Sequence, residues 1–314
     1  MRKKVQISII IPVFNSSQTL EQLYNRLKST MRDITEFWEV IFVDDGSIDN
    51  SWKKINEICT ADINNLGIKL KKNYGQHNAL LCGIRHANYD YIITIDDDLQ
   101  NPPEEIPLLI NEIQNGYDVV YGYPKGEKHS FLRNLASIIT KVALKTAMGV
   151  KTARHVSAFR IFRTNLRKSF SSYRGSFVSI DVLLSWSTNS FNSIPVNHLA
   201  RSKGHSNYTV KKLIKHAFNM ITGFSVLPLQ IASIIGFLFS MFGLIILFFV
   251  LGRYFIQGST VQGFPFLASI VSIFSGAQLL AIGIIGEYLS RMHFRTMDKP
   301  QYFIGEKLNL DSKN

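Results

Sequence analysis

The N-terminal part of the chain alternates short apolar runs with amphipathic stretches of helical period. The pattern predicts strands at residues 5–12, 39–43, 68–70, 91–95 and 119–121. Between them it predicts helices at residues 19–31, 51–59, 78–86 and 104–114. Alternation of this kind is typical of an α/β fold, in which helices cover both faces of a mostly parallel, doubly wound sheet. Such a sheet binds its ligands beyond the carboxyl ends of its strands.

Two long apolar stretches follow, at residues 228–251 and 264–285. Each has the roughly 20 residues that a helix needs to cross a bilayer. A hairpin buried in a protein core is the alternative, but Phe, Ile and Leu occupy every face of both stretches. We therefore predict a two-helix transmembrane anchor. Ala268, Ser272 and Gly276 form a small-residue stripe suited to helix packing, within the chain or in a homo-oligomer.

Cationic residues flank the apolar stretches. Two amphipathic segments, at residues 131–148 and 209–226, suit helices in the headgroup region of an anionic bilayer, although an ordinary surface helix is the alternative for each. The connection between the apolar stretches holds the single cation Arg253, whereas several cations follow the second stretch, so the positive-inside rule places both chain ends in the cytoplasm. The predicted order is a cytoplasmic domain at 1–208, a juxtamembrane helix at 209–226, the two spans within 227–286 and a cytoplasmic tail at 287–314.

The net charge of +12 indicates anionic partners. The basic residues gather near the apolar segments and no basic pattern interleaved with aromatic residues is present, which favours a bilayer surface and phosphorylated substrates over nucleic acid. Only Cys59 and Cys82 are present, so no disulfide framework is expected. Pro12 and Asn15 interrupt the first apolar run, which therefore predicts a buried strand rather than a signal peptide.

Three consecutive acids, Asp96, Asp97 and Asp98, follow the strand predicted at 91–95. Because side chains alternate along a strand, we expect Asp96 and Asp98 to point to the same side. Carboxylate oxygens placed in this way suit Mg²⁺ or Mn²⁺, which would bridge to substrate phosphates. A solvated acidic turn is the alternative.

A second acidic strand end is formed by Asp44 and Asp45, which are followed by Gly46 and Ser47. A carboxylate here suits a hydrogen bond to a ribose or a base edge. Asp and Ser also cap helices, so this signal is weak by itself. Two acidic strand ends in one sheet give stronger support for a nucleotide site than either does alone.

Taken together, these motifs resemble the family 2 glycosyltransferases of GT-A fold. The segments that match are Ile9-Ile10-Ile11-Pro12-Val13-Phe14-Asn15 as the opening strand, Val43-Asp44-Asp45-Gly46-Ser47 as the nucleotide-binding turn, and Asp96-Asp97-Asp98 as the DxD-type motif. A narrower resemblance, to the polyprenyl-phosphate branch, rests on Asn73-Tyr74-Gly75-Gln76, on Asp98-Leu99-Gln100-Asn101-Pro102-Pro103-Glu104, and on Arg201, Gly204, Ser206 and Tyr208. That branch includes dolichol-phosphate mannose synthase, the bacterial undecaprenyl-phosphate glucosyltransferases and the aminoarabinose-type transferases. The resemblance covers nearly the whole chain.

The resemblance implies an inverting transferase of the bacterial inner membrane. Its donor would be a nucleotide-diphosphate sugar, UDP-linked, and its acceptor undecaprenyl or another polyprenyl phosphate. The residues carried over for Mg²⁺ or Mn²⁺ are Asp96, Asp98 and Gln100; those for the nucleotide sugar are Pro12, Phe14, Asp44, Asp45, Gln76, Asp96 and Asp97; those for the lipid phosphate are Arg160, Arg201, Ser206 and Tyr208; and those for catalysis are Asp98 and Arg201. An interfacial arginine that holds lipid headgroups is the alternative for Arg201.

The chain departs from the branch pattern at two positions. Ser16 stands where many relatives have a glutamate, so a nucleoside contact assigned to that acid does not carry over. Ser157-Ala158-Phe159-Arg160 replaces an Asp-Phe-Arg motif whose aspartate is a proposed base. A phosphate monoester has its second pKa near 6, so the acceptor is already largely a dianion at neutral pH and needs positioning more than deprotonation. Asp181 is the remaining candidate catalytic base, with a structural role as the alternative.

Two other functions compete with this one. A transferase that acts on a lipid or glycan hydroxyl would need a carboxylate base, and the Ser157-Ala158 substitution counts against it. A non-catalytic assembly subunit built on a transferase scaffold would not need the acids and the arginine, and the presence of Asp96, Asp98 and Arg201 counts against that hypothesis.

Overall fold

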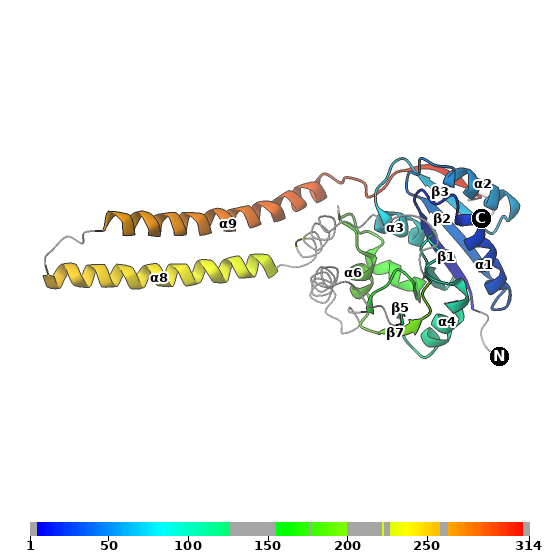
Figure 1. The fold of residues 1–314 in the computed structure, drawn as a ribbon, viewed down its shortest axis with the longest axis horizontal. Helices are drawn as coiled ribbons and strands as arrows, with labels where there is room; N and C mark the ends of the chain where they lie inside the picture. The colour runs from blue at the N-terminus through cyan, green and yellow to red at the C-terminus, as the bar shows by residue number, and fades with distance from the viewer. Residues whose placement is uncertain are drawn as a thin grey trace.

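The computed structural model describes residues 5–125, 155–175, 177–199, 222, 227–257 and 263–309. One α/β domain carries a long helical hairpin, formed by α8 and α9, that projects from one side (Figure 1). The helix predicted at 131–148 and nearly all of the juxtamembrane segment at 209–226 lie outside the described residues.

A mixed sheet forms the centre of the domain. Within the described residues its strand order is β7-β5-β6-β4-β1-β2-β3-β8. Strand β1 is parallel to β2 and β4, β2 to β3 and β5 to β7, whereas β6 runs antiparallel to β4 and β5, and β8 antiparallel to β3. The strands are β1 (Ile7–Val13), β2 (Trp38–Asp44), β3 (Leu66–Leu70), β4 (Tyr91–Thr94), β5 (Val119–Pro124), β6 (Arg160–Arg163), β7 (Phe191–Val196) and β8 (Ile304–Leu308). The predicted α/β fold with a mostly parallel sheet is confirmed.

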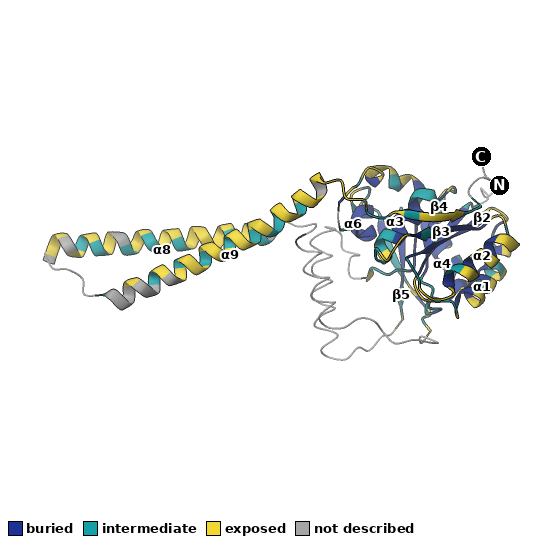
Figure 2. Cartoon of the chain, turned by 90° about the horizontal axis from the view of Figure 1, so that it is seen from above, coloured by how far each residue is buried: buried dark blue, intermediate teal, exposed yellow. Residues whose placement is uncertain are grey.

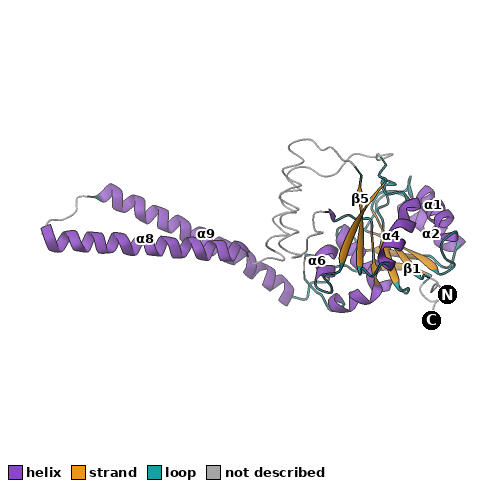
Figure 3. Cartoon of the chain, turned by 90° about the horizontal axis from the view of Figure 1, so that it is seen from below, coloured by secondary structure: helices purple, strands orange, loops and turns teal. Residues whose placement is uncertain are grey.

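Helices cover both faces of this sheet, as Figure 3 shows. They are α1 (Leu20–Arg32), α2 (Ser51–Ala61), α3 (Gln76–His86), η1 (Pro103–Glu105), α4 (Ile106–Gln114), η3 (Thr164–Phe170) and α6 (Ile180–Ser185). Alternate residues of β1 enter opposite layers: Ile9 and Ile11 pack with α1, α2 and α4, whereas Ile10 packs with α3 and α6. Burial on both faces explains why the central strands read as continuous apolar runs.

Helix α3 lies unusually close to the sheet at Gly83. A Cβ atom built on this glycine would lie 2.4 Å from Cγ2 of Ile10 and 3.3 Å from Cγ2 of Val43. Both neighbours are fully buried, so neither has room to move. The glycine therefore sets the distance between α3 and strands β1 and β2, and with it the position of the N-terminal end of α3.

The hairpin consists of α8 (Leu227–Gln257) and α9 (Phe264–Thr296). Both helices carry a segment long and apolar enough to cross a membrane, at Pro228–Arg253 and Ile273–Phe294, and neither segment is buried inside the protein. Figure 2 shows exposed and partly exposed residues along both helices, in contrast to the buried sheet. Phe239 of α8 and Phe274 of α9 meet edge to face with ring centroids 5.3 Å apart. A hairpin buried in a protein core would have buried side chains instead, so the exposure argues against that alternative.

The segment expected as a tail, residues 287–314, holds the last turns of α9 and the edge strand β8. Strand β8 pairs with β3, with Glu306 opposite Lys69. Trp52 Nε1 donates a hydrogen bond to Glu306 Oε2 (3.1 Å), and Asn309 Nδ2 donates to the carbonyl oxygen of Cys59 (2.6 Å). The end of α9 and the domain must therefore lie on the same side of any membrane that the hairpin crosses.

We predict that Gly83→Ala lowers the free energy of unfolding of the domain by about 1–3 kcal/mol, because the added methyl group overpacks a rigid core. Thermal unfolding of the full chain in detergent measures this change. Gly305→Ala is the matched control, since the nearest atoms to its Cβ are Cδ and Cε of the flexible Lys71 side chain. Equal destabilisation by the two substitutions would contradict the close approach of α3.

Candidate functional site

The carboxyl ends of three parallel strands meet at one edge of the sheet. Val13 of β1 pairs with Asp44 of β2, and Ile10 of β1 pairs with Thr94 of β4. The pairing continues past the strands, since Asp45 N donates to the Val13 carbonyl oxygen (2.8 Å) and Ile95 N to that of Ile10 (3.2 Å). The register therefore brings the two acidic strand ends to either side of β1, as the motifs require.

The acidic motif Asp96–Asp98 lies just beyond β4, which ends at Thr94. Asp97 and Asp98 belong to a turn, so the alternation expected for an extended strand does not apply to them. Asp96 Oδ1 accepts a hydrogen bond from Gln76 Nε2 (2.6 Å), Asp97 Oδ2 accepts one from Phe14 N (3.2 Å), and Asp98 Oδ1 accepts one from Gln100 N (3.1 Å). The three carboxylates thus contact three different segments, of which Gln76 begins α3 and Phe14 follows β1.

Leu99, directly after the motif, has a positive φ of 62°. This backbone region is unusual for a bulky residue and costs on the order of 1 kcal/mol or more. The side chain is 4% exposed and packs in the core between the sheet and α1, α2 and α4. Its burial holds the turn in a conformation that keeps the preceding carboxylates at the surface of the site.

The carboxylates of this motif ionise with difficulty. Burial, reinforced by the charges of Asp98 and Asp97, raises the pKa of Asp96 to about 7, and the positive charge of Arg160 opposes that rise. Burial also raises the pKa of Asp97 to about 6, against the hydrogen bonds that its carboxylate accepts. Crowded carboxylates with raised pKa values are typical of functional sites.

A divalent cation suits this group chemically, because it would relieve the repulsion between adjacent carboxylates. Within the described residues no cluster of three or more His, Cys, Asp or Glu side chains is arranged to hold a metal. Asp96, Asp98 and Gln100 would therefore supply only part of a coordination shell, and phosphate oxygens of a substrate would complete it. Incomplete protein coordination of this sort is usual for Mg²⁺ at phosphate sites.

The second acidic turn has two carboxylates with different roles. Asp45 accepts hydrogen bonds from the backbone N–H groups of Tyr74 (2.7 Å) and Gly75 (2.8 Å), so it fixes the turn that precedes Gln76. Asp44 Oδ1 accepts one from Ser47 N (3.2 Å), while Asp44 Oδ2 is buried with no partner among the described residues. Burial raises the pKa of Asp44, and it raises that of Asp45 to about 6. The unpaired oxygen of Asp44 is an acceptor that a ligand donor would satisfy.

Gly46 is required at this turn for two reasons. Its φ is +73°, and a Cβ atom would lie 2.6 Å from the backbone carbon of Lys72. Beside the turn, the ring of Phe14 is 43% exposed at the end of β1, whereas Pro12 is buried within the strand. Of these two predicted nucleoside contacts, Phe14 offers an exposed ring face at the site.

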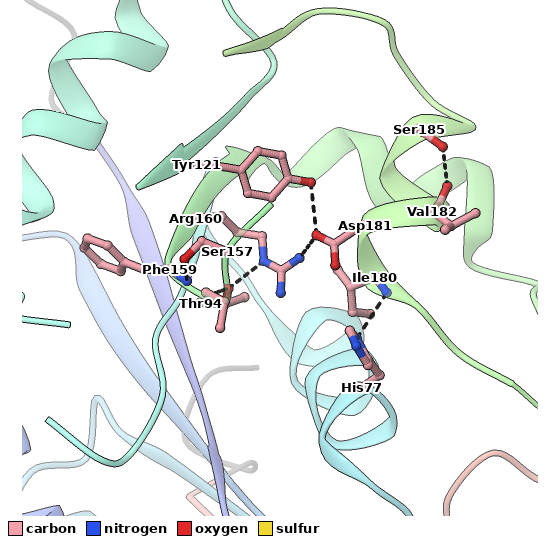
Figure 4. A network of polar contacts seen from close by, with 11 residues as sticks. His77, Thr94, Tyr121, Ser157, Phe159, Arg160, Ile180, Asp181, Val182 and Ser185 are labelled. Atoms are coloured by element: carbon pink, nitrogen blue, oxygen red, sulfur yellow. Dashed lines mark hydrogen bonds and ion pairs between the residues drawn. The ribbon is translucent and has the colours of Figure 1, made fainter. Parts of the chain in front are cut away.

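A buried ion pair lies on the other side of the acidic motif (Figure 4). Arg160 of β6 is paired in the sheet with Thr94 of β4 and with Tyr121 of β5. Its Nε donates to Thr94 Oγ1 (3.0 Å), and its Nη1 donates to Asp181 Oδ1, which also accepts from the Tyr121 hydroxyl (3.0 Å). Arg160 is 2% exposed and Asp181 is 5% exposed. The guanidinium is therefore held on two edges, and its Nη2 makes no hydrogen bond within the described part of the chain.

This network also joins α6 to α3. The N–H of Ile180, next to Asp181, donates to Nδ1 of His77 (3.3 Å), and His77 follows Gln76, the residue that contacts Asp96. Arg160 and Asp181 are site residues expected from the sequence, whereas Thr94 and Tyr121 are not. The one feature of the sequence that could have pointed to them is that both are polar residues at the carboxyl ends of predicted strands.

Three predicted lipid-phosphate residues, Arg201, Ser206 and Tyr208, lie outside the described residues. The chain before them is attached to the acidic motif, because Leu199 N donates to the carbonyl oxygen of Gln100 (2.8 Å). Asn197 Nδ2 also donates to Glu105 Oε1 (2.7 Å). These roles stay predictions.

We predict that Asp96→Asn stabilises the metal-free protein at pH 8 by on the order of 1–3 kcal/mol. The pKa of Asp96 is about 7 in the folded chain and about 4 in the unfolded one, so the folded state binds the extra proton. Its ionised form therefore opposes folding at high pH, and this penalty fades as the pH falls from 8 towards 5. Unfolding with chelator at both pH values measures the difference. The exposed Asp90→Asn is the control, and an equal effect of the two variants would contradict the buried charge.

Known proteins resemble this chain in sequence over most of its length. The model of a family described as Glycosyl transferase family 2 matches residues 8–173. The undecaprenyl-phosphate 4-deoxy-4-formamido-L-arabinose transferase of Shewanella sediminis is 34% identical over 305 residues, covering 96% of this chain and 92% of that protein. The transferase of the same name from Proteus mirabilis is 32% identical over 312 residues, covering 98% of this chain and 96% of that protein.

A solved structure shows the same fold. It is a crystal structure of glucosyl-3-phosphoglycerate synthase from Mycobacterium tuberculosis, in complex with Mn²⁺, uridine diphosphate and glucosyl-3-phosphoglycerate. It matches with a TM-score of 0.50 at 17% identity and covers 69% of this chain and 78% of that one. With a family match over more than half its length and relatives that align almost end to end, the chain belongs to glycosyl transferase family 2.

Proposed function

We propose that the chain transfers a sugar from a nucleotide-diphosphate sugar, UDP-linked, to undecaprenyl phosphate or another polyprenyl phosphate, with inversion at the anomeric carbon. This proposal rests on the presence of two features in one chain. One is a sheet edge that carries an acidic motif, as in nucleotide-binding sheets, and the other is a hairpin of two apolar helices. Relatives aligned over nearly the full length are named for transfer to undecaprenyl phosphate. Their donor sugar, 4-deoxy-4-formamido-L-arabinose, is the first to test.

The protein groups divide between the two substrates. The Phe14 ring would stack on the base, and the unpaired Oδ2 of Asp44 would accept a hydrogen bond from the nucleoside. Asp96, Asp98 and Gln100 would hold Mg²⁺ or Mn²⁺, which supplies positive charge against the charge that develops on the departing diphosphate. The crystal of the synthase with the same fold contains Mn²⁺, which supports the use of a divalent metal.

The acceptor phosphate would be held by cationic residues. The proposed contacts are from Nη2 of the buried Arg160 to a phosphate oxygen and from Arg201, the second arginine proposed from the sequence. A phosphate dianion needs no base at neutral pH. Asp181 shares its carboxylate with Arg160 and Tyr121, which suits a group that positions the guanidinium better than one that accepts a proton.

The membrane placement follows from the same proposal. Both helices of the hairpin would cross the bacterial inner membrane, with the catalytic domain and both chain ends on the cytoplasmic side. The pairing of β8 with β3 supports this arrangement, because it needs an even number of crossings between the domain and the end of α9. The long isoprenoid would then stay in the bilayer while its phosphate reaches the sheet edge.

Transfer of radiolabel to undecaprenyl phosphate in detergent tests the reaction. We predict that one member of a panel of UDP-sugars and GDP-mannose gives a lipid product that mild acid cleaves and chelator prevents, and that Asp98→Asn loses at least about 100-fold in rate because charge stabilisation is lost. Asp90→Asn, which removes an exposed charge, is the matched control. UDP binding without any lipid product would reject the phosphate acceptor and favour a hydroxyl acceptor.

A second prediction separates positioning from base catalysis at Asp181. We expect Asp181→Asn to lower the transfer rate about 10- to 100-fold at every pH between 6 and 8.5, because Arg160 loses its fixed orientation. A base would matter less as the pH rises above the second pKa of the acceptor, near 6, so a deficit that disappears at pH 8.5 would contradict positioning. Asp118→Asn is the control, since it breaks a partly exposed Arg–Asp pair with Arg163 (3.2 Å) at the far end of β6.

A further inference from the structure

A polar pocket lies where the hairpin joins the domain, apart from the site described above. Its volume is about 420 Å³, and it is formed by the connection from α9 to β8, the last turn of α3 and the segment after η3. Gln301 of that connection donates from Nε2 to the carbonyl oxygen of Tyr173 (2.8 Å), so the wall of the pocket is fixed to the domain. Gln76 and Arg85 lie nine residues apart on α3, so about 14 Å of helix separates the pocket from the acidic motif.

The pocket carries excess positive charge. Its charged lining residues are Arg85, Arg174, Lys299 and one acid, Asp298. Arg85 donates to neutral oxygens only, namely the Tyr302 hydroxyl (3.3 Å) and the carbonyl oxygens of Ser171 (3.3 Å) and Tyr173 (2.9 Å). Its buried Nε has no partner among the described residues. The charge of Arg85 is therefore fixed in place without a carboxylate to neutralise it.

The other two cations are also available to an anion. Arg174 meets Asp298 at 3.5 Å, but both side chains are largely exposed, and such pairs are weak. Lys299 lies 5.8 Å from the centre of the Phe294 ring and has no ion pair within the described residues. Three cationic side chains around one pocket suit a phosphate group, because its oxygens can accept several hydrogen bonds from charged donors at once.

The position of the pocket indicates where that phosphate comes from. The candidate membrane segment of α9 ends at Phe294, after a last stretch that holds the Glu287–Arg291 ion pair, and the pocket lining begins at Asp298, four residues later. Two of those residues are still helical, so the lining begins within about 10 Å of the end of that candidate segment, close to the headgroup layer of a bilayer. Trp186, 52% exposed, packs edge to face with Tyr173 beside the pocket (5.4 Å). Half-exposed Trp and Tyr are typical of membrane interfaces.

We propose that this pocket binds the phosphate group of an anionic membrane lipid and thereby holds the catalytic domain against the bilayer surface. The inference rests on the membrane placement proposed above. It differs from the acceptor site, because the ligand is a bulk phospholipid that is not consumed.

Full-length protein in nanodiscs free of polyprenyl phosphate tests the pocket. We predict that replacing part of the phosphatidylcholine with phosphatidylglycerol raises the apparent Tm of the wild type by about 2–4 °C, because a ligand of the folded state stabilises it. The double variant Arg174→Gln, Lys299→Gln should lose most of this rise. Arg32→Gln with Lys53→Gln is the matched control, since these exposed cations lie on α1 and α2, on the side of the domain away from the hairpin (Figure 1).

Two outcomes would overturn the proposal. An equal rise in the double variant and the control would assign the effect to general attraction between a basic protein and an acidic bilayer. The same rise from inorganic phosphate in phosphatidylcholine nanodiscs would make the ligand a free anion and not a lipid. Sugar transfer in nanodiscs supplied with undecaprenyl phosphate is measured separately, so an active wild type that gains nothing from phosphatidylglycerol rejects the pocket and leaves the proposed function standing.

Discussion

The parallel pairing of β1 with both β2 and β4 is the constraint on which the site depends, because it forces acidic strand ends to meet at one edge of a buried sheet. Burial and mutual repulsion oppose the ionisation of Asp96, Asp97 and Asp45. Hydrogen-bond donors around these carboxylates offset part of the cost of ionising them. Gln76 at the start of α3, the Phe14 backbone after β1 and the turn at Tyr74 before α3 supply them.

The same donors connect the two halves of the site. Helix α3 begins at the residue that contacts Asp96, is set at a fixed distance from the sheet by Gly83, and meets α6 through His77. Helix α6 in turn carries the carboxylate that orients Arg160. A displacement of α3 would therefore alter the acidic motif and the arginine together. The position of this single helix links the proposed donor side of the site to the proposed acceptor side.

The sequence predicts the N-terminal part of the fold well, because the apolar residues of each helix and strand there recur with a clear helical or strand spacing. Strands β6, β7 and β8 escaped prediction since Arg160–Arg163, Phe191–Val196 and Ile304–Leu308 are short and partly polar, and distant partners in the sheet decide their structure. At the site, the motifs identify the acids but not their partners. Nothing local to Asp45 reveals that it binds the backbone at Tyr74, and nothing near Asp181 reveals Arg160 and Tyr121.

Strand β8 has a further consequence for how the chain is made. It covers the outer edge of β3, which would otherwise expose unpaired backbone groups, yet it follows both apolar helices in the sequence. A ribosome releases β3 long before it releases β8. On the proposed membrane placement, the nascent domain keeps an open sheet edge while the hairpin enters the membrane, and β8 pairs with β3 only afterwards. That placement would make completion of the sheet follow insertion of the hairpin.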